Sequence, residues 1–143
     1  MEDHVLILKQ KGLKVTPQRL EIMRYLDKNR MHPSIDHIFT QLKKKNPSLS
    51  KTTVYNAIDD LSENGVIQVL TINRSEILCD FNSDPHYHFM CKECGAVTDL
   101  DESYNENLIE KIRNEGYRVD EAFGYFRGTC RSCLNKNREG EIK

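Results

Sequence analysis

The sequence predicts an α+β fold with a helical N-terminal part and a smaller C-terminal part that mixes strands with one helix. Three observations support this prediction. Helix-start signals precede amphipathic segments within the first 65 residues, and two strand-like segments follow them. All five cysteines lie after residue 65. We expect the two parts to be residues 1–81 and 86–143, joined by a linker at 82–85.

Capping residues mark the expected helices. A short helix opens at residues 6–8, and Thr16 then stands before a proline that fits the first helical position, where a missing N–H costs nothing. Ser34 and Ser50 precede two further segments with apolar residues at helical spacing, and Gly65 ends the last one, which runs over 51–64.

Two strands, 66–70 and 76–81, are expected to follow these helices and to be joined by a turn at 73–75. Three or four helices followed by such a hairpin is the layout of a winged helix-turn-helix, a fold that places its last helix in the major groove of DNA. Hydrogen-bonding and basic side chains gather at the start of that helix: Lys51, Thr52, Thr53, Tyr55 and Asn56. The alternative reading is a polar face that only meets solvent.

The charge distribution favours nucleic-acid contact by the N-terminal part. Residues 1–65 hold eleven Lys or Arg against eight Asp or Glu, whereas the remainder holds ten against fourteen. The formal net charge of −1 therefore hides an asymmetry that directs phosphate contact to the first part.

The composition indicates an intracellular protein. No run approaches the ~18 apolar residues of a membrane span, and the acidic start of the chain is unlike a secretory signal. We expect a cytoplasmic location, where thiols stay reduced and clustered cysteines more often bind metal than form disulfides.

The C-terminal part carries two paired Cys-x-x-Cys motifs. Its expected elements are strands at 86–89, 96–100 and 118–127, a helix at 105–114 and a loose polar tail from residue 135. The motifs consist of Cys91 with Cys94 and Cys130 with Cys133, and 35 residues separate them. Two such pairs complete a tetrahedral zinc site with no open position for chemistry, so the zinc is structural. The alternatives are a redox disulfide or inert buried thiols.

A second set of ligand-type residues mixes imidazoles with carboxylates. His86 and His88 project from one face of a strand, with Asp80 before them and Asp99 on the next expected strand. Nitrogen and oxygen ligands suit Fe(II), Mn(II) or Zn(II). The alternative is that the histidines face solvent and the aspartates only end strands.

Two other functional classes would use the same metal-ligand residues. A hydrolytic metal centre would need an open coordination position and a general base beside it, and no acid–base residue stands out, so we expect no enzyme. A structural zinc-ribbon adaptor would bind one zinc per chain and neither Mn(II) nor Fe(II).

Taken together, four motifs resemble the ferric uptake regulator (Fur) family over nearly the whole chain. They are Gly12–Arg19, His32–Ser34, Ser50–Tyr55 and His86–Gly95. The resemblance implies a metal-dependent transcriptional repressor that binds a palindromic operator as a homodimer through a C-terminal dimerisation domain. It supports the four cysteines as zinc ligands.

The resemblance also adds residues that spacing alone does not identify. It implies that His32 joins Asp80, His86, His88 and Asp99 in a regulatory Fe(II) or Mn(II) site, and its first motif adds Lys14 and Arg19 to the expected DNA-binding set.

Within the family, the chain looks closest to the peroxide-sensing branch. Asp99 stands where iron-sensing members more often carry Glu, and Tyr87 interrupts a His-Asp-His run typical of many iron regulators. In that branch bound Fe(II) reacts with hydrogen peroxide and oxidises a ligand histidine, here His32 or His86, which releases the DNA. The alternative is an iron-responsive or other metal-uptake regulator without peroxide sensing.

Overall fold

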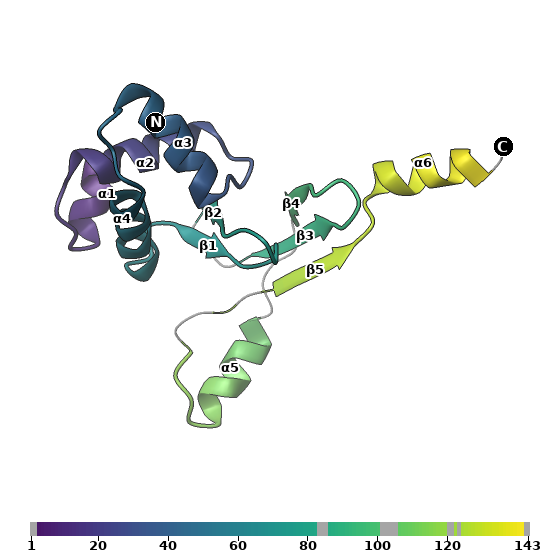
Figure 1. The fold of residues 1–143 in the computed structure, drawn as a ribbon. Coiled ribbons are helices and arrows are strands. Elements are labelled where there is room, and N and C mark those ends of the chain that lie inside the picture. The colour runs from purple at the N-terminus through teal and green to yellow at the C-terminus, as the bar shows by residue number, and fades with distance from the viewer. Residues whose placement is uncertain (1–2, 83–85, 101–105, 120–121, 123, 142–143) are drawn as a thin grey trace. The chain divides into compact units, whose positions relative to one another are not determined.

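The chain divides into two compact units, Met1–Asp84 and Pro85–Lys143. The computed structural model describes residues 3–82, 86–100, 106–119, 122 and 124–141 (Figure 1). Of the linker expected at 82–85, residues 83–85 lie outside the described residues.

Over residues 3–82, the N-terminal unit folds into four helices and a two-stranded sheet, and Figure 1 shows their arrangement. Its elements are α1 (His4–Gln10), α2 (Pro17–Lys28), α3 (Ile35–Lys45), α4 (Lys51–Glu63), β1 (Gln68–Leu70) and β2 (Leu78–Asp80). The side chains of Thr16, Ser34 and Ser50 each accept a hydrogen bond from a backbone N–H in the first turn of the helix that follows. The three capped helix starts that the sequence predicts are therefore confirmed.

Apolar faces of the four helices enclose the core of this unit. Helix α4 packs against α2 and α3, and β1 pairs antiparallel with β2. The core side chains from the helices are Leu8, Ile22, Met23, Leu26, Ile35, Ile38, Leu42, Val54, Ala57, Ile58 and Leu61. This arrangement confirms the predicted winged helix-turn-helix.

The two strands of the wing, β1 and β2, are both shorter than the sequence predicts. The segment expected to begin at Val66 begins pairing only at Gln68, because the N–H of Val66 donates to the carbonyl of Leu61 and closes the end of α4. Gly65 makes this closure possible with a φ of 72°. On the other strand, Ser34 bridges to Leu78, which joins the start of α3 to the wing.

The C-terminal unit is built on a three-stranded sheet of order β4-β3-β5. Its elements are β3 (Tyr87–Cys91), β4 (Val97–Asp99), α5 (Glu106–Asn114), β5 (Gly124–Gly128) and α6 (Arg131–Glu141). Strand β3 pairs antiparallel with β4 and parallel with β5. Parallel pairing needs a crossover connection, and the segment that contains α5 supplies it.

Two expectations for this unit are corrected by the structure. The strand expected at 118–127 is a strand only from Gly124 onward, and residues 120, 121 and 123 lie outside the described residues. Residue 105, where the helix was expected to start, also lies outside them. The tail expected to be loose from residue 135 is helical to Glu141. Its residue Asn137 donates to the Glu93 carboxylate at 3.2 Å, which ties α6 to the first cysteine pair.

Within the described part of the chain, no helix is long and apolar enough to cross a membrane.

Candidate metal centres and DNA-binding surface

The four paired cysteines converge at one end of the C-terminal sheet. Their sulfur atoms all lie within 4.8 Å of one another, with Cys91 Sγ 3.7 Å from Cys133 Sγ and Cys94 Sγ 3.8 Å from Cys130 Sγ. Zinc bonded to four sulfurs at about 2.3 Å in a tetrahedron separates them by about 3.8 Å. The donors therefore fit a tetrahedral zinc ion.

Parallel pairing of β3 with β5 explains why the two cysteine pairs meet. Because the strands run in the same direction, Cys91 at the end of β3 lies opposite Gly128 at the end of β5. The Lys92 N–H then donates to the Gly128 carbonyl at 2.7 Å, and the turn that follows reverses at Gly95 with a φ of 77°. Each pair thus begins where a paired strand ends.

The environment of the four thiols favours thiolate at one position. The N–H groups of Cys94 and Cys130 point at Cys91 Sγ from 3.5 Å and 3.4 Å, and they lower the pKa of Cys91 to about 6. The pKa of Cys133 is raised to about 12, first by its hydrogen bond with Cys130 and then by burial. Neighbouring thiols oppose each other's ionisation, and a shared divalent cation removes that conflict by binding the thiolates.

Cys79 is separate from this centre. It is fully buried in the core of the N-terminal unit, and burial raises the pKa of its thiol to about 12. It fits the role of a core residue.

His86, His88 and Asp99 form a second cluster of donors within the C-terminal unit. His88 lies directly opposite Asp99 in the β3–β4 register, and His86 shares the face of His88 because the two are separated by one residue. Asp99 Oδ1 lies 2.9 Å from His86 Nε2 and 3.0 Å from His88 Nε2. The Asp99 carboxylate accepts a hydrogen bond from the His86 imidazole.

The same spacing fits a metal ion. Two ligands at about 2.1 Å from an ion and at right angles are about 3.0 Å apart, and two histidines with one carboxylate are the facial triad of non-haem Fe(II) sites. Asp99 and either imidazole can therefore occupy adjacent coordination positions without moving apart.

His32 and Asp80 form a pair within the N-terminal unit. Both are buried, and His32 Nε2 lies 3.4 Å from Asp80 Oδ2. The Asn82 N–H donates to the other oxygen of Asp80 at 2.9 Å, which orients the carboxylate. His32 has a φ of 58°, a left-handed conformation that costs a residue with a side chain about 1 kcal/mol.

The backbone beside this pair explains how such a conformation is held. The Cys79 N–H donates to the Pro33 carbonyl at 2.8 Å, so the residue after His32 is bonded to the residue before Asp80. Local sequence could not reveal this pairing, because it depends on the contact between the start of α3 and β2.

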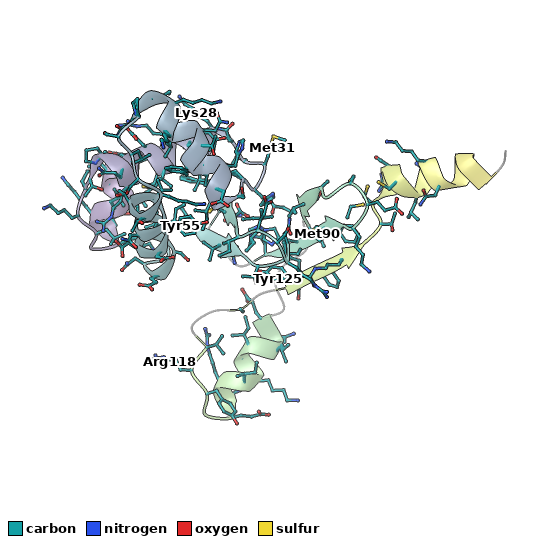
Figure 2. All side chains as sticks on the ribbon, viewed as in Figure 1. Lys28, Met31, Tyr55, Met90, Arg118 and Tyr125 are labelled. Carbon is teal, nitrogen blue, oxygen red and sulfur yellow. The ribbon has the colours of Figure 1, made fainter. Side chains whose placement is uncertain are left out.

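The residues expected to contact DNA lie at the start of α4, ahead of α2 (Lys14) and in the first turn of α2 (Arg19). Figure 2 shows Tyr55 on the N-terminal unit, and within α4 the side chains of Lys51, Thr52 and Asn56 are exposed. Thr53 Oγ1 lies 2.7 Å from Ser50 Oγ and so belongs to the helix cap.

Lys51 and Tyr55 both contact Asp36 on α3. Tyr55 Oη donates to Asp36 Oδ1 at 2.8 Å, and Lys51 Nζ lies 3.0 Å from the same oxygen. Sequence reasoning missed Asp36, because its proximity to α4 follows from how the two helices pack.

Arg19 and Lys14 occupy different environments. The Arg19 guanidinium donates to Asp60 Oδ2 on α4 at 2.9 Å and to the Lys14 carbonyl at 2.6 Å. Arg19 therefore links α2 to α4, whereas the Lys14 side chain is exposed.

Comparison with known proteins identifies the family. Residues 10–123 match the model of the ferric uptake regulator family. The chain belongs to this family. The peroxide-responsive repressor PerR of Staphylococcus aureus is 32% identical over 139 residues, which cover 95% of this chain and 93% of that protein.

Solved structures of family members share the fold. The peroxide stress regulator of Campylobacter jejuni is 29% identical with a TM-score of 0.68, and the match covers 92% of this chain and 100% of that one. A zinc uptake regulator solved with zinc and DNA gives a TM-score of 0.73 at 23% identity over 94% of this chain and 92% of that one. The family resemblance expected from the sequence motifs is thus confirmed.

Proposed function

We propose that this protein is a metal-dependent transcriptional repressor that binds operator DNA as a homodimer and releases it in response to hydrogen peroxide. The observation that carries the proposal is the convergence of His86, His88 and Asp99 at ligand spacing. It occurs in a family member whose relatives include peroxide-responsive repressors at 32% identity.

The sensing site takes donors from both units of the chain. His32 and Asp80 supply one imidazole and one carboxylate, and the His86–His88–Asp99 cluster supplies three further donors. Together they form a site of nitrogen and oxygen ligands, which suits Fe(II) or Mn(II). The four-cysteine centre holds structural Zn(II) and takes no part in sensing.

Binding of one ion by donors on both sides of the linker restrains the hinge between the units. In a homodimer this restraint sets the spacing of the two α4 helices, which must match operator half-sites about one DNA turn apart. Without the ion, the cost of ordering the hinge falls on DNA binding, so the affinity for DNA is lower.

The peroxide response depends on which ion fills the site. Bound Fe(II) supplies the reaction in which hydrogen peroxide adds one oxygen atom to a ligand imidazole and leaves its other oxygen as water. His32 and His86 are the expected targets. An oxidised imidazole is a poorer ligand, so the hinge is freed and the DNA is released. The function is regulatory, carries no catalytic turnover and belongs in the cytoplasm.

Substitution of His86 by alanine tests the sensing site. The variant should lose Mn(II)-activated DNA binding while zinc stays near one ion per chain, because the cysteine centre does not use this residue. Operator selection from a random-sequence duplex library supplies the DNA. A variant that still binds DNA in a Mn(II)-dependent way would contradict the proposed site.

Peroxide treatment of the Fe(II)-loaded and Mn(II)-loaded forms tests the signal. We expect mass spectrometry to find one added oxygen on His32 or His86 in the iron form only, together with loss of DNA binding. Iron-dependent DNA binding without histidine oxidation would favour the iron-responsive alternative. Turnover of a substrate without metal-dependent DNA binding would instead favour an enzyme.

A further inference from the structure

The carboxylate of Asp36 lies within hydrogen-bonding distance of two residues of the expected DNA-binding set. It accepts a hydrogen bond from Tyr55 Oη at 2.8 Å, and the same oxygen lies 3.0 Å from Lys51 Nζ. The Lys51 ammonium also lies 5.9 Å from the centre of the Tyr55 ring. One acidic side chain on α3 therefore contacts both a base-reading type and a phosphate-binding type of residue on α4.

The three groups stabilise one another's protonation states at neutral pH. The hydrogen bond from Tyr55, followed by that from Lys51, lowers the pKa of Asp36. The same carboxylate raises the pKa of Tyr55 and that of Lys51. The cluster thus contains a carboxylate, a neutral phenol and an ammonium.

Stability alone does not explain this cluster. An acid in the first turn of α3 interacts well with the helix dipole, but that effect requires no contact with α4. The N-cap of α3 is already provided by Ser34, which accepts the His37 N–H at 3.1 Å. Exposed ion pairs add little to folding stability, and the side chains of Lys51 and Asp36 are each 57% exposed.

In DNA binding the same cluster has two opposite effects. Affinity for DNA of arbitrary sequence comes from the neutralisation of phosphates by basic side chains. A carboxylate that pairs with the Lys51 ammonium therefore weakens this non-specific affinity. Affinity for a preferred sequence depends on side chains that meet base edges in a defined conformation. Holding Tyr55 and Lys51 before DNA arrives lowers the cost of ordering them.

We propose that Asp36 is a positioning residue that determines DNA specificity: it holds Lys51 and Tyr55 for sequence reading and opposes binding to DNA that offers only phosphates. This inference rests on the proposed function, because it requires α4 to enter the major groove. It adds to that function a carboxylate that sets the ratio between specific and non-specific binding.

The experiment compares two variants that lose the same charge. Asp36→Asn removes the carboxylate from the cluster. Glu63→Gln removes an exposed carboxylate at the other end of α4, about 18 Å from Lys51 along the helix. The Mn(II)-loaded full-length proteins are titrated by fluorescence anisotropy with two duplexes over a range of KCl concentrations. One duplex is selected from a random library by the wild type, and the other is its scrambled sequence.

For Asp36→Asn we expect affinity for the scrambled duplex to rise about fivefold and the selected-to-scrambled affinity ratio to fall at least about tenfold. Its salt dependence on the scrambled duplex should steepen by about one unit, because Lys51 becomes available to one more phosphate. Glu63→Gln should change neither the ratio nor the slope.

A Lys51→Gln background provides a second measurement. There, Asp36→Asn should no longer steepen the salt dependence, since the ammonium that it releases is absent. Equal effects of the two charge-removing variants would overturn the inference, as would an unchanged affinity ratio in Asp36→Asn. If the Mn(II)-loaded wild type binds no duplex at all, the proposed function itself fails and the inference falls with it.

Discussion

Replacement of Gly124 by alanine tests the close approach of β3 and β5 that places the candidate metal centres. Gly124 lies opposite Tyr87 in the parallel register, and the Tyr87 ring covers it so closely that a Cβ at Gly124 would overlap ring atoms Cδ1 and Cε1. The ring must therefore move. Tyr87 stands between His86 and His88 in the sequence, so its movement also disturbs the histidine cluster.

The magnitude follows from comparison with a second glycine. Overpacking of a packed site costs about 1–3 kcal/mol, and an overlap with ring carbons belongs in the middle of that range. We therefore expect Gly124→Ala to lower the free energy of unfolding by about 2 kcal/mol. A Cβ at Gly128 would lie 3.2 Å from Phe89 Cζ, a contact that a small shift relieves. Gly128→Ala should thus cost less than about 1 kcal/mol.

Urea unfolding of the zinc-loaded protein measures both changes. Far-ultraviolet circular dichroism follows the loss of secondary structure, and release of zinc to a chromogenic chelator follows the C-terminal unit. In a Tyr87→Ala background the Gly124→Ala substitution should cost almost nothing, because the overlapping ring is absent. The reasoning would be refuted if Gly124→Ala were as stable as Gly128→Ala, or if its cost were the same with and without the Tyr87 ring.

Two further predictions concern two of the cysteines and the ion pairs of Asp27, a partly buried residue. Cys94→Ser should reduce zinc from about one ion per chain to nearly none and unfold the C-terminal unit, whereas Cys79→Ser should keep its zinc. Metal analysis and circular dichroism of both variants would show the difference. Zinc retained in Cys94→Ser would exclude Cys94 as a ligand. Asp27 lies 2.6 Å from Arg30 and 3.0 Å from His4, and hydrogen bonds from Arg30 and then His4 lower the pKa of Asp27. A lowered carboxyl pKa contributes stability that is present above its unfolded value of about 4 and is lost as pH falls through its folded value. Thermal midpoints measured from pH 5 down to pH 3 should therefore fall more steeply in the wild type than in Asp27→Asn; parallel curves would contradict this.

Local signals explain which parts of the fold could be predicted from the sequence. Helix starts at Thr16, Ser34 and Ser50 depend on a capping side chain and the next few residues, so they were predicted correctly. The wing strand was predicted too long because the Val66 N–H is taken by the end of α4. Helix α6 was missed because its polar sequence has no apolar repeat to signal burial, while Asn137 ties it to the first cysteine pair.

The residues of the candidate site also divide into those that local sequence could predict and those that it could not. His86 and His88 could be paired with Asp99 because residues two apart share a strand face and the neighbouring strand supplies the carboxylate. The approach of His32 to Asp80 depends on a tertiary contact between the start of α3 and β2, so only family resemblance pointed to it. Asp36 carried no motif at all, and its contact with Tyr55 became visible only once α3 and α4 were packed together.

Strand β3 carries residues of both candidate metal centres, and under the proposed function this predicts an order of loading. His88 lies within the strand and Cys91 ends it, so the same few residues present a donor for the regulatory ion and a thiol for zinc. We expect a chain without zinc to lose the anchor at the end of β3, the strand that carries His88. Under the proposed function, zinc occupancy would therefore precede sensing, and a cell starved of zinc would hold newly made protein that does not respond to iron, manganese or peroxide.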